Sequence, residues 1–455
     1  MTTNDADRIS ARLLGKQDPP LEELLALDSE DEAGTDGSPP ERLFARQATA
    51  LLNRLGQFGA DPEGGTSRLL YSPAWQNAQA ALEEWMNGCG LRPYYDDAGN
   101  LFGRLEGTDP LDRGVILTGS HIDTVRRGGL YDGAYGVVGA LIAVSYLQRK
   151  YGPPRRTLEV VSFAEEEGSR FPLTFWGSGN VTGLYDTRKT PDIVDAEGVT
   201  LADAMNGAGF GLKRYRPSRR SDVRAFIELH IEQGAVLERE RKTIGIVQGI
   251  VGQKRFTFHV KGEANHAGTT PMSYRKDALS AACEMALYVR EAALQAGDPL
   301  VATVGKLEAS PGVANVVPGA ASFTVDIRHA EAEALMLFCR SMRERFEQIA
   351  ARYGVTVDGE EWMSAAPVPM SAKLTALLGK LCISRGLPYR SMYSGAGHDA
   401  QIVSAICPAA MVFVPSYNGI SHSPHEFTSE NDLAAGIVVL ADLLYMLAYE
   451  GEAAI

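Results

Sequence analysis

The sequence predicts an α/β fold, in which a mixed sheet with a parallel core is flanked by helices and a smaller α+β domain is inserted. Short apolar runs alternate with helical segments over residues 41–248, as in parallel sheets. Residues 249–363 instead contain strands with alternating apolar and polar residues. The alternation of short apolar runs with helical segments resumes at 364–455. We therefore expect one domain from 41–248 and 364–455, an inserted domain at 249–363, and a partly disordered N-terminal extension at 1–40.

The first half of the chain indicates the parallel core. Residues 42–59 and 73–90 place apolar side chains at helical spacing, and each segment is closed by glycine. The apolar runs 114–118 and 158–164 are expected to be buried strands, with a helix at 136–151 between them. This strand-helix-strand order favours two parallel neighbours in one sheet.

The inserted domain has a different pattern. Residues 254–263 and 321–329 alternate apolar and polar side chains, which favours a sheet with one solvent-facing side, and a helix is expected at 277–297. Residues 28–41 are rich in acid, Gly, Ser and Pro and are expected to be a flexible linker. The last expected elements are a helix at 374–386, a buried strand at 409–415 and a helix at 434–451.

Composition limits the function classes. The chain has 455 residues, 45% of them hydrophobic, and its 44 basic and 57 acidic residues give a net charge of −13. This charge argues against nucleic-acid binding and against a polybasic membrane patch. No apolar stretch of 18 residues is apparent and the N-terminus carries acid, so we expect a cytoplasmic protein. No CxxC pair occurs, and buried thiols in a reducing compartment are expected at Cys89, Cys283, Cys339, Cys382 and Cys407.

Acids and histidines follow several of the predicted strands. Taken singly, each is most simply a surface hydrogen bond or a solvated charge. Because the carboxyl ends of parallel strands meet at one edge, together they would crowd like charges there, which two divalent cations would compensate. Imidazole and carboxylate ligands suit zinc, manganese or nickel better than calcium. The residues concerned are His121, Asp123, Asp132, Glu165, Glu166, Glu167, His230, Glu232, Gln233 and His422.

Eight ordered motifs between about Gln47 and the C-terminus carry a resemblance to a known family. They are GSHIDTVRRGGLYDGAYGV, AEEEGSRF, ELHIEQG, NHAGTTPM, ANVVPG, DIRH, SGAGHDA and GISHSP. The sequence resembles the dinuclear metal amidohydrolases of the aminoacylase and carboxypeptidase type. Within them it resembles the branch that holds allantoate amidohydrolases, N-carbamoyl-L-amino acid hydrolases and β-ureidopropionases.

The resemblance implies two divalent metal ions per subunit, with manganese expected and zinc or nickel as alternatives. His121 and His230 match the ligands of one ion. Glu167 and His422 match the ligands of the other, and Asp132 matches the carboxylate that bridges both. A histidine at position 230, where peptidase relatives tend to have an acid, points to the branch that cleaves ureido groups.

The catalytic residues implied by the resemblance are Glu166, Asp123 and His266. Glu166 is expected to be the general base, which takes a proton from water and passes it to the departing nitrogen. Asp123 is expected to hydrogen-bond the far nitrogen of His121. His266 is expected to donate to the charged oxygen of the tetrahedral intermediate.

The resemblance also implies substrate contacts. Gln233 matches a residue that contacts the ureido group, and Arg328, assisted by Asn315, matches the clamp on a substrate carboxylate. His398 and Asp399 match residues that line the pocket. In relatives the smaller domain is a lid that also carries the dimer contact, so we expect a homodimer. The sequence does not say which lid residues serve the neighbouring subunit.

Two stretches, SRFPLTFWGSGN and PSYNGISHSP, resemble allantoate amidohydrolases in particular. We therefore expect hydrolysis of allantoate to ureidoglycine, ammonia and carbon dioxide, in purine nitrogen salvage. An N-carbamoyl-L-amino acid or β-ureidopropionate stays open as the substrate, and a non-catalytic metal-binding scaffold is a third hypothesis. His259 and His329 are expected to be structural, and His422 rather than His425 is expected to be the ligand.

Overall fold

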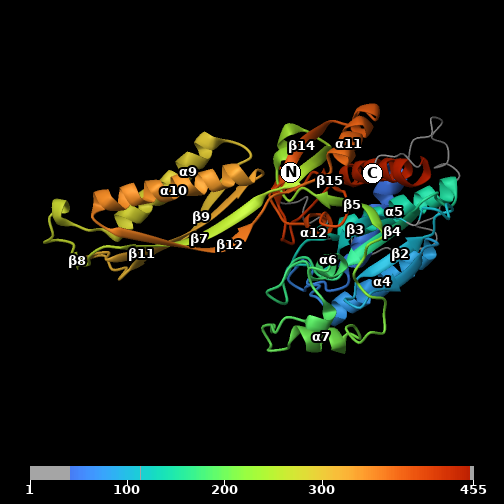
Figure 1. The fold of residues 1–455 in the computed structure, drawn as a ribbon, viewed down its shortest axis with the longest axis horizontal. Helices are drawn as coiled ribbons and strands as arrows, with labels where there is room; N and C mark the ends of the chain where they lie inside the picture. The colour runs from blue at the N-terminus through green and yellow to red at the C-terminus, as the bar shows by residue number, and fades with distance from the viewer. Residues whose placement is uncertain (1–40, 113, 451–455) are drawn as a thin grey trace. The chain divides into compact units, whose positions relative to one another are not determined.

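The computed structural model describes residues 41–112 and 114–450, so the predicted extension at 1–40 lies outside the described residues. The chain forms two compact units. The second unit comprises Val247–Met370 and Met392–Gly397, and the first unit contains the rest of the described chain. Figure 1 labels the elements of both. The roles of lid and dimer contact that were predicted for residues 249–363 stay predictions.

The first unit contains the mixed sheet that the sequence predicts. Its strands follow the order β1-β2-β4-β3-β5-β15-β6. Strands β4, β3, β5 and β15 are parallel neighbours, whereas β1 and β2 pair antiparallel at one side. These strands are β1 (Arg92–Tyr95), β2 (Leu101–Leu105), β3 (Val115–His121), β4 (Thr157–Phe163), β5 (Val223–Ile231), β6 (Ile244–Ile250) and β15 (Ala409–Val414), and β14 (Tyr389–Ser394) also pairs with β6. The predicted fold class is therefore confirmed.

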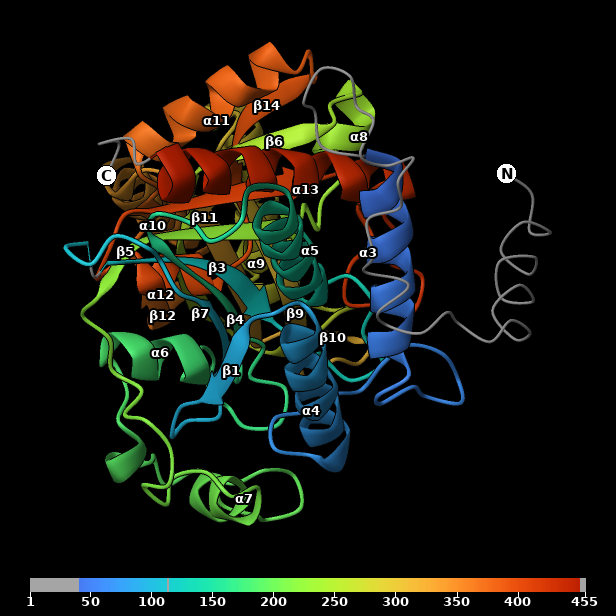
Figure 2. The ribbon, with the colours of Figure 1, turned by 90° about the vertical axis from the view of Figure 1, so that its right-hand side faces the viewer.

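Helices cover the sheet of the first unit. They are α3 (Glu41–Gly56), α4 (Pro73–Gly88), α5 (Ala134–Tyr151), α6 (Trp176–Thr182), α7 (Leu201–Gly207), α8 (Val236–Glu240), α11 (Ala372–Ser384), α12 (Asp399–Val403) and α13 (Glu430–Tyr445). Three of them, α3, α5 and α13, contact one another and lie side by side in Figure 2. The predicted helices at 42–59, 73–90 and 136–151 correspond to α3, α4 and α5.

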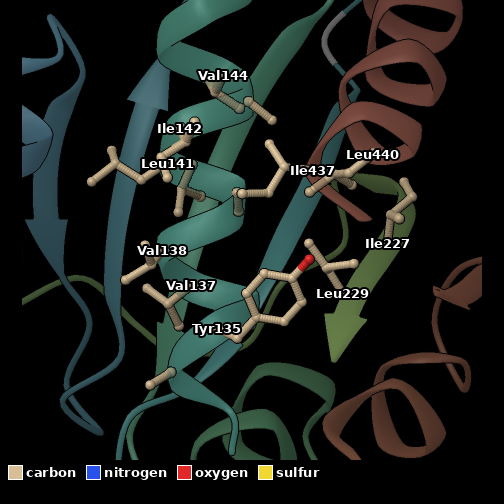
Figure 3. Packing of buried hydrophobic residues seen from close by; sticks show 14 of the residues in the cluster. Tyr135, Val137, Val138, Leu141, Ile142, Val144, Ile227, Leu229, Ile437 and Leu440 are labelled. Atoms are coloured by element: carbon tan, nitrogen blue, oxygen red, sulfur yellow. The ribbon is translucent and has the colours of Figure 1, made fainter. Parts of the chain in front are cut away.

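Helix α5 is buried on almost every side, which explains why its sequence is apolar nearly throughout. Figure 3 shows Tyr135 of α5 beside Leu229 of β5, with Ile437 of α13 on the same side of the helix, whereas Val137, Val138 and Leu141 point to its other side. The Tyr135 hydroxyl donates a hydrogen bond to the Leu433 carbonyl (2.7 Å) and so ties α5 to α13. A Cβ at Gly436 would overlap that hydroxyl, so this contact requires glycine.

Side chains alternate along β5, so the polar residues Glu228 and His230 lie on the face of the sheet opposite to the apolar residues next to them. Ile227 and Leu229 point toward α5 and α13 (Figure 3), so Glu228 and His230 point to the other side, where α12 contacts β5. Both residues are buried, although neither is apolar. The polar residues of the strand therefore lie on the side where the acids and histidines gather.

The second unit is an antiparallel sheet with helices on one face. The order is β12-β7-β11-β9, and α9 and α10 contact these strands. Phe256, Phe258 and Val260 of β7 are buried, whereas His259 and Lys261 are exposed, as the alternation predicts. The elements are β7 (Gly252–Lys261), β8 (Asn265–His266), α9 (Ala278–Ala296), β9 (Val301–Ser310), β10 (Val316–Val317), β11 (Ala320–His329), α10 (Ala332–Tyr353), β12 (Thr356–Ala365) and β13 (Val368–Pro369).

Two predictions are corrected. Residues Glu430–Glu450 form a helix that is long and apolar enough to cross a membrane by length and composition, so the expectation of no apolar stretch of 18 residues is wrong. Most of this helix is buried in the first unit, and Asp442 within it pairs with Arg385 (2.8 Å); core helices of globular proteins satisfy the same criteria. Four of the five cysteines are buried thiols, but Cys283 is exposed.

Candidate metal centre

The candidate residues of the first unit lie at the carboxyl ends of the parallel strands. His121 ends β3 and pairs in register with Phe163, after which β4 leads into the turn of Glu165, Glu166 and Glu167. His230 of β5 pairs in register with Phe413 of β15, and the loop after β15 carries His422. The edge predicted from the sequence is thus formed by four adjacent strands, which is where open α/β sheets bind ligands.

One group of possible ligand atoms joins His121, Asp132 and His230. The distance from Asp132 Oδ1 to His121 Nε2 is 3.8 Å, and to His230 Nε2 it is 3.3 Å. Each ring is fixed through its other nitrogen, because His121 Nδ1 lies 3.0 Å from the Asp123 carbonyl and His230 Nδ1 lies 2.9 Å from the Ile231 carbonyl. With Nδ1 so engaged, Nε2 of each histidine faces Asp132.

A second group joins Asp132, Glu167 and His422. His422 Nε2 lies 3.2 Å from Asp132 Oδ2 and 3.3 Å from Glu167 Oε1. In each of the two groups, the donor atoms all lie within 4.8 Å of one another. Asp132 therefore offers one oxygen to each group, which is the arrangement that a bridging carboxylate requires.

The electrostatics of these groups favour added positive charge. Burial opposes protonation of His121, but the Asp123 carboxylate outweighs it and holds the pKa of His121 well above its usual value. For Glu167, burial disfavours the charged carboxylate and raises its pKa to about 7. Buried carboxylates of like sign are stable only with a proton or a cation between them. The residues present thus fit two divalent cations in charge, in donor type and in spacing.

Asp123 fixes the acidic turn as well as His121. Its Oδ2 accepts the backbone N–H groups of Glu166 and Glu167, each at 3.1 Å, while its Oδ1 lies 3.4 Å from His121 Nδ1. Asp123 therefore holds two acids after β4 through its carboxylate and the ring of His121 through its backbone carbonyl. The predicted hydrogen bond between the Asp123 carboxylate and His121 stays a prediction.

Glu166 has the features of a general base. It is buried, and its carboxylate makes no hydrogen bond to any residue that the structure describes. Burial raises the pKa of Glu166 well above its usual value, and the neighbouring carboxylate of Glu167 adds to the shift. A raised pKa suits a carboxylate that must take a proton and release it near neutral pH.

Three predicted pocket residues lie against this cluster. The Gln233 side chain donates to Asp132 Oδ2 (2.8 Å) from a backbone with φ of 57°. His398 packs edge-on against His230 at a ring distance of 4.6 Å, and burial holds the pKa of His398 well below its usual value, so the ring is neutral. Asp399 is buried beside it, and burial raises the pKa of its carboxyl group.

The remaining predicted site residues belong to the second unit. His266 of β8 pairs in register with Val316 of β10, and the Ala267 N–H donates to the Asn315 carbonyl (2.9 Å), so His266 and Asn315 are neighbours. Arg328 lies near the last residue of β11, eight residues after the strand starts at Ala320. At the usual rise per residue of a strand, the distance from Ala320 to Arg328 is about 26 Å. Figure 1 shows β8 beyond the opposite end of this sheet.

Arg328 is held by its neighbours within the second unit. Its guanidinium bonds both oxygens of Asp326 (3.0 and 3.1 Å) and donates to the Gly395 carbonyl (2.5 Å). Of the other histidines, His259 is exposed on β7, His329 Nδ1 accepts from the Glu331 N–H, and His425 is exposed outside the two ligand groups.

Sequence reasoning missed two buried acids at the centre. Glu228 accepts from the Ser120 hydroxyl (2.7 Å) and from the Ala400 N–H (2.8 Å), behind His230. Glu426 accepts from backbone N–H groups beside Asp132. The signal for Glu228 was its place two residues before His230 on a strand, and for Glu426 its place four residues after His422.

Comparison with known proteins gives a consistent result. The model of peptidase family M20/M25/M40 matches residues 117–446. The allantoate amidohydrolase of Escherichia coli (strain K12) is 48% identical over 407 residues, which cover 90% of this chain and 99% of that protein. The allantoate amidohydrolase of Bacillus subtilis (strain 168) is 46% identical, over 88% of this chain and 97% of that protein.

More distant relatives have other names. The N-carbamoyl-L-amino acid amidohydrolase of Geobacillus stearothermophilus is 38% identical over 90% of this chain and 99% of its own length. Among solved structures, an amidase of the hydantoinase/carbamoylase family from Burkholderia multivorans superposes with a TM-score of 0.84 at 33% identity, over 88% of this chain and 97% of its own.

Proposed function

Because the chain belongs to peptidase family M20/M25/M40 and is an amidohydrolase of that family, we propose that it hydrolyses a ureido C–N bond of allantoate. The products are ureidoglycine, ammonia and carbon dioxide, as in purine nitrogen salvage in the cytoplasm. The observation that carries the proposal is one buried carboxylate, Asp132, that serves two ligand groups beside a free Glu166. Relatives at 48% and 46% identity that are named allantoate amidohydrolases support the substrate.

The metal ligands of the proposal are His121, His230, Asp132, Glu167 and His422. Two divalent cations held there would supply the Lewis acidity that polarises a ureido carbonyl and acidifies water. We propose manganese as the native metal, with zinc or nickel as alternatives, because mixed oxygen and imidazole donors accept all three.

The chain's own residues move the proton. Glu166 takes a proton from the attacking water and delivers it to the departing nitrogen, which leaves as an amine. Asp123 keeps Glu166 in place through the backbone of the turn. The former ureido carbonyl carbon is released as carbamate, which decomposes to ammonia and carbon dioxide. The reaction consumes one water in all and needs no redox partner.

Residues of the second unit are proposed to bind the substrate. His266 and Asn315 donate to the developing oxyanion and the substrate, and Arg328 binds the carboxylate of allantoate in a bidentate manner. Gln233 and His398 border the ureido group from the first unit. β8, which carries His266, lies beyond the end of the four-stranded sheet where β11 starts, and Arg328 lies eight residues from that start, about 26 Å along the strand. His266 and Arg328 therefore cannot both contact one small substrate within a subunit. We therefore propose that the two ends serve different subunits of a homodimer.

A surface on the second unit supports the homodimer. β9 is an edge strand of ten residues, and it offers unpaired backbone groups along its outer side. Leu287 and Leu294 of α9, and Val301 and Leu307 of β9, are exposed apolar side chains. Analytical ultracentrifugation should give a dimer for the native chain.

The alternative substrate is an N-carbamoyl-L-amino acid or β-ureidopropionate, which the relative at 38% identity favours. The decisive experiment removes metal, reloads manganese, zinc or nickel, and measures ammonia release from allantoate, N-carbamoyl-alanine and β-ureidopropionate in parallel. Metal-dependent release from allantoate alone supports the proposal. If kcat/KM for a carbamoyl compound exceeds that for allantoate by more than tenfold, the substrate assignment changes to that compound and the catalytic residues stay as proposed. If no compound releases ammonia with any metal, the result favours a non-catalytic scaffold.

A further inference from the structure

A buried glutamate that the catalytic scheme does not use joins two loops of the proposed metal centre. Glu426 is 6% exposed, and its Oε1 accepts the backbone N–H of Tyr131 (2.8 Å) and of Asp132 (3.1 Å). Its Oε2 accepts from the Ser421 hydroxyl (2.9 Å). One carboxylate therefore spans the loop after β3 and the loop after β15, which are nearly 300 residues apart in sequence.

Ser421 extends this connection to the side chain of Asp132. Its hydroxyl lies 2.9 Å from Asp132 Oδ2 and 2.9 Å from Glu426 Oε2. A hydroxyl has one proton to donate, so Ser421 donates to one of these oxygens at a time and sits between both. Asp132 is thus fixed at its backbone by Glu426 and at its Oδ2 by Ser421, while His422 follows Ser421 directly.

The loop after β3 is shaped around the Glu426 side chain. A Cβ at Gly129 would overlap the Glu426 carboxylate, so only glycine lets the chain pass this close. The contact is therefore specific in shape as well as in hydrogen bonding.

We propose that Glu426 is a positioning residue that sets Asp132 and His422 at the separation which two bridged metal ions require. This inference rests on the proposed dinuclear centre and deepens it. The role is geometric: Glu426 matters because its oxygens reach two backbone N–H groups and Ser421 together. Side chains of equal reach should therefore replace it, and a shorter acid should not.

Three variants separate reach from charge. Glu426→Gln keeps the reach, since its carbonyl oxygen can accept both N–H groups and its amide can donate to Ser421, but it loses the charge. Glu426→Asp keeps the charge and loses one methylene of reach, and Glu426→Ala loses both. The matched control is Glu430→Gln, because Glu430 is an exposed acid four residues further along with no role in the centre.

The measurement is the dissociation constant of Mn²⁺, from competition with a chelator, together with the EPR signal of the exchange-coupled ion pair. We expect Glu426→Ala and Glu426→Asp to weaken binding about 10- to 100-fold, as loss of a residue that orients metal ligands does, and to lose the coupled signal. Glu426→Gln and Glu430→Gln should stay within about threefold of the parent. Thermal unfolding of each metal-free variant separates loss of folding from loss of the site.

Each result decides something. Parent-like binding by Glu426→Ala overturns the inference, and so does binding retained by Glu426→Asp but lost by Glu426→Gln, because charge would then matter and reach would not. If Glu426→Ala fails to fold, Ser421→Ala tests the same connection, and unchanged affinity and an unchanged coupled signal overturn it. If the parent itself binds fewer than two ions, the proposed dinuclear centre fails first, and that outcome is distinct from failure of the variants.

Discussion

Replacing Asp123 by alanine tests whether the acidic turn depends on one buried carboxylate. Asp123 Oδ2 accepts the N–H groups of Glu166 and Glu167, each at 3.1 Å, and no other described side chain accepts from those two groups. Alanine leaves both buried donors without their acceptor. The turn that carries the proposed base and one ligand then loses its fixed orientation.

The magnitude follows from the number of bonds lost. A hydrogen bond to a charged acceptor contributes about 1.5–3 kcal/mol, so two contribute about 3–6 kcal/mol. These two bonds hold the turn that carries Glu166, so their loss acts on the geometry of the transition state as well as on folding. At about 1.4 kcal/mol per factor of ten, about 3–6 kcal/mol sets the upper bound of the fall in kcat/KM at about 10²- to 10⁴-fold. Asp123→Asn should lose less, about tenfold, because its remaining oxygen can still accept both N–H groups and the backbone carbonyl of residue 123 can still accept from His121 Nδ1.

The assay is kcat/KM for ammonia release with metal content measured on the same samples. Asp195→Ala is a matched control, because Asp195 also accepts two backbone N–H groups, those of Glu197 and Val199 (2.9 Å each), outside the ligand cluster. It should lower the unfolding temperature and leave kcat/KM near the parent value. Asp123→Ala with two bound metals and kcat/KM within about threefold of the parent would refute the reasoning.

Three further predictions concern the same centre. Glu166→Gln should lower kcat about 10²- to 10⁴-fold while both metals stay bound, since Glu166 is outside the two donor groups; turnover at the parent rate contradicts its role as base. His422→Ala should retain one tightly bound metal per chain, and two would rule out His422 as a ligand. Metal affinity should rise as the pH rises from about 6 to 9, because burial raises the pKa of Glu167 to about 7 and the hydrogen bond to Asp132 raises that of His422 to about 9. Below these values protons occupy the atoms that a metal needs, so calorimetry showing a flat pH profile would contradict the assignment.

The sequence predicts the strands well where burial and apolarity coincide. The run expected at 114–118 is β3, but the strand continues through Gly119 and Ser120 to His121, all buried. None of these last three residues is an apolar strand former, so a rule based on apolar runs ends the strand early. Glu228 is hidden for the same reason, since it is a fully buried acid within β5.

Contacts between distant loops could not be predicted from the chain alone. Arg68 is 1% exposed and donates to the Ile122 carbonyl (2.7 Å) and the Leu55 carbonyl (2.9 Å), yet nothing in GGTSRLLYS separates it from a surface arginine. Glu426 meets Asp132 across 294 positions. Periodicity carries information over one element, whereas these contacts depend on how the sheet orders its strands.

The resemblance and the physics of the strand ends lead to the same residues by independent routes. Asp132 lies between three imidazoles, at 3.8, 3.3 and 3.2 Å, while Glu166 and Glu167 are buried acids next to one another. In such a cluster the histidine pKa values rise because carboxylates are near, and the glutamate pKa values rise because burial disfavours their charge. Both shifts keep protons on these groups near neutral pH. A bound divalent cation would lower both sets of pKa values, because its positive charge compensates the carboxylates and disfavours protonated imidazole. Metal loading should therefore release protons from histidine and glutamate together, which a centre built only for structural hydrogen bonds would not do.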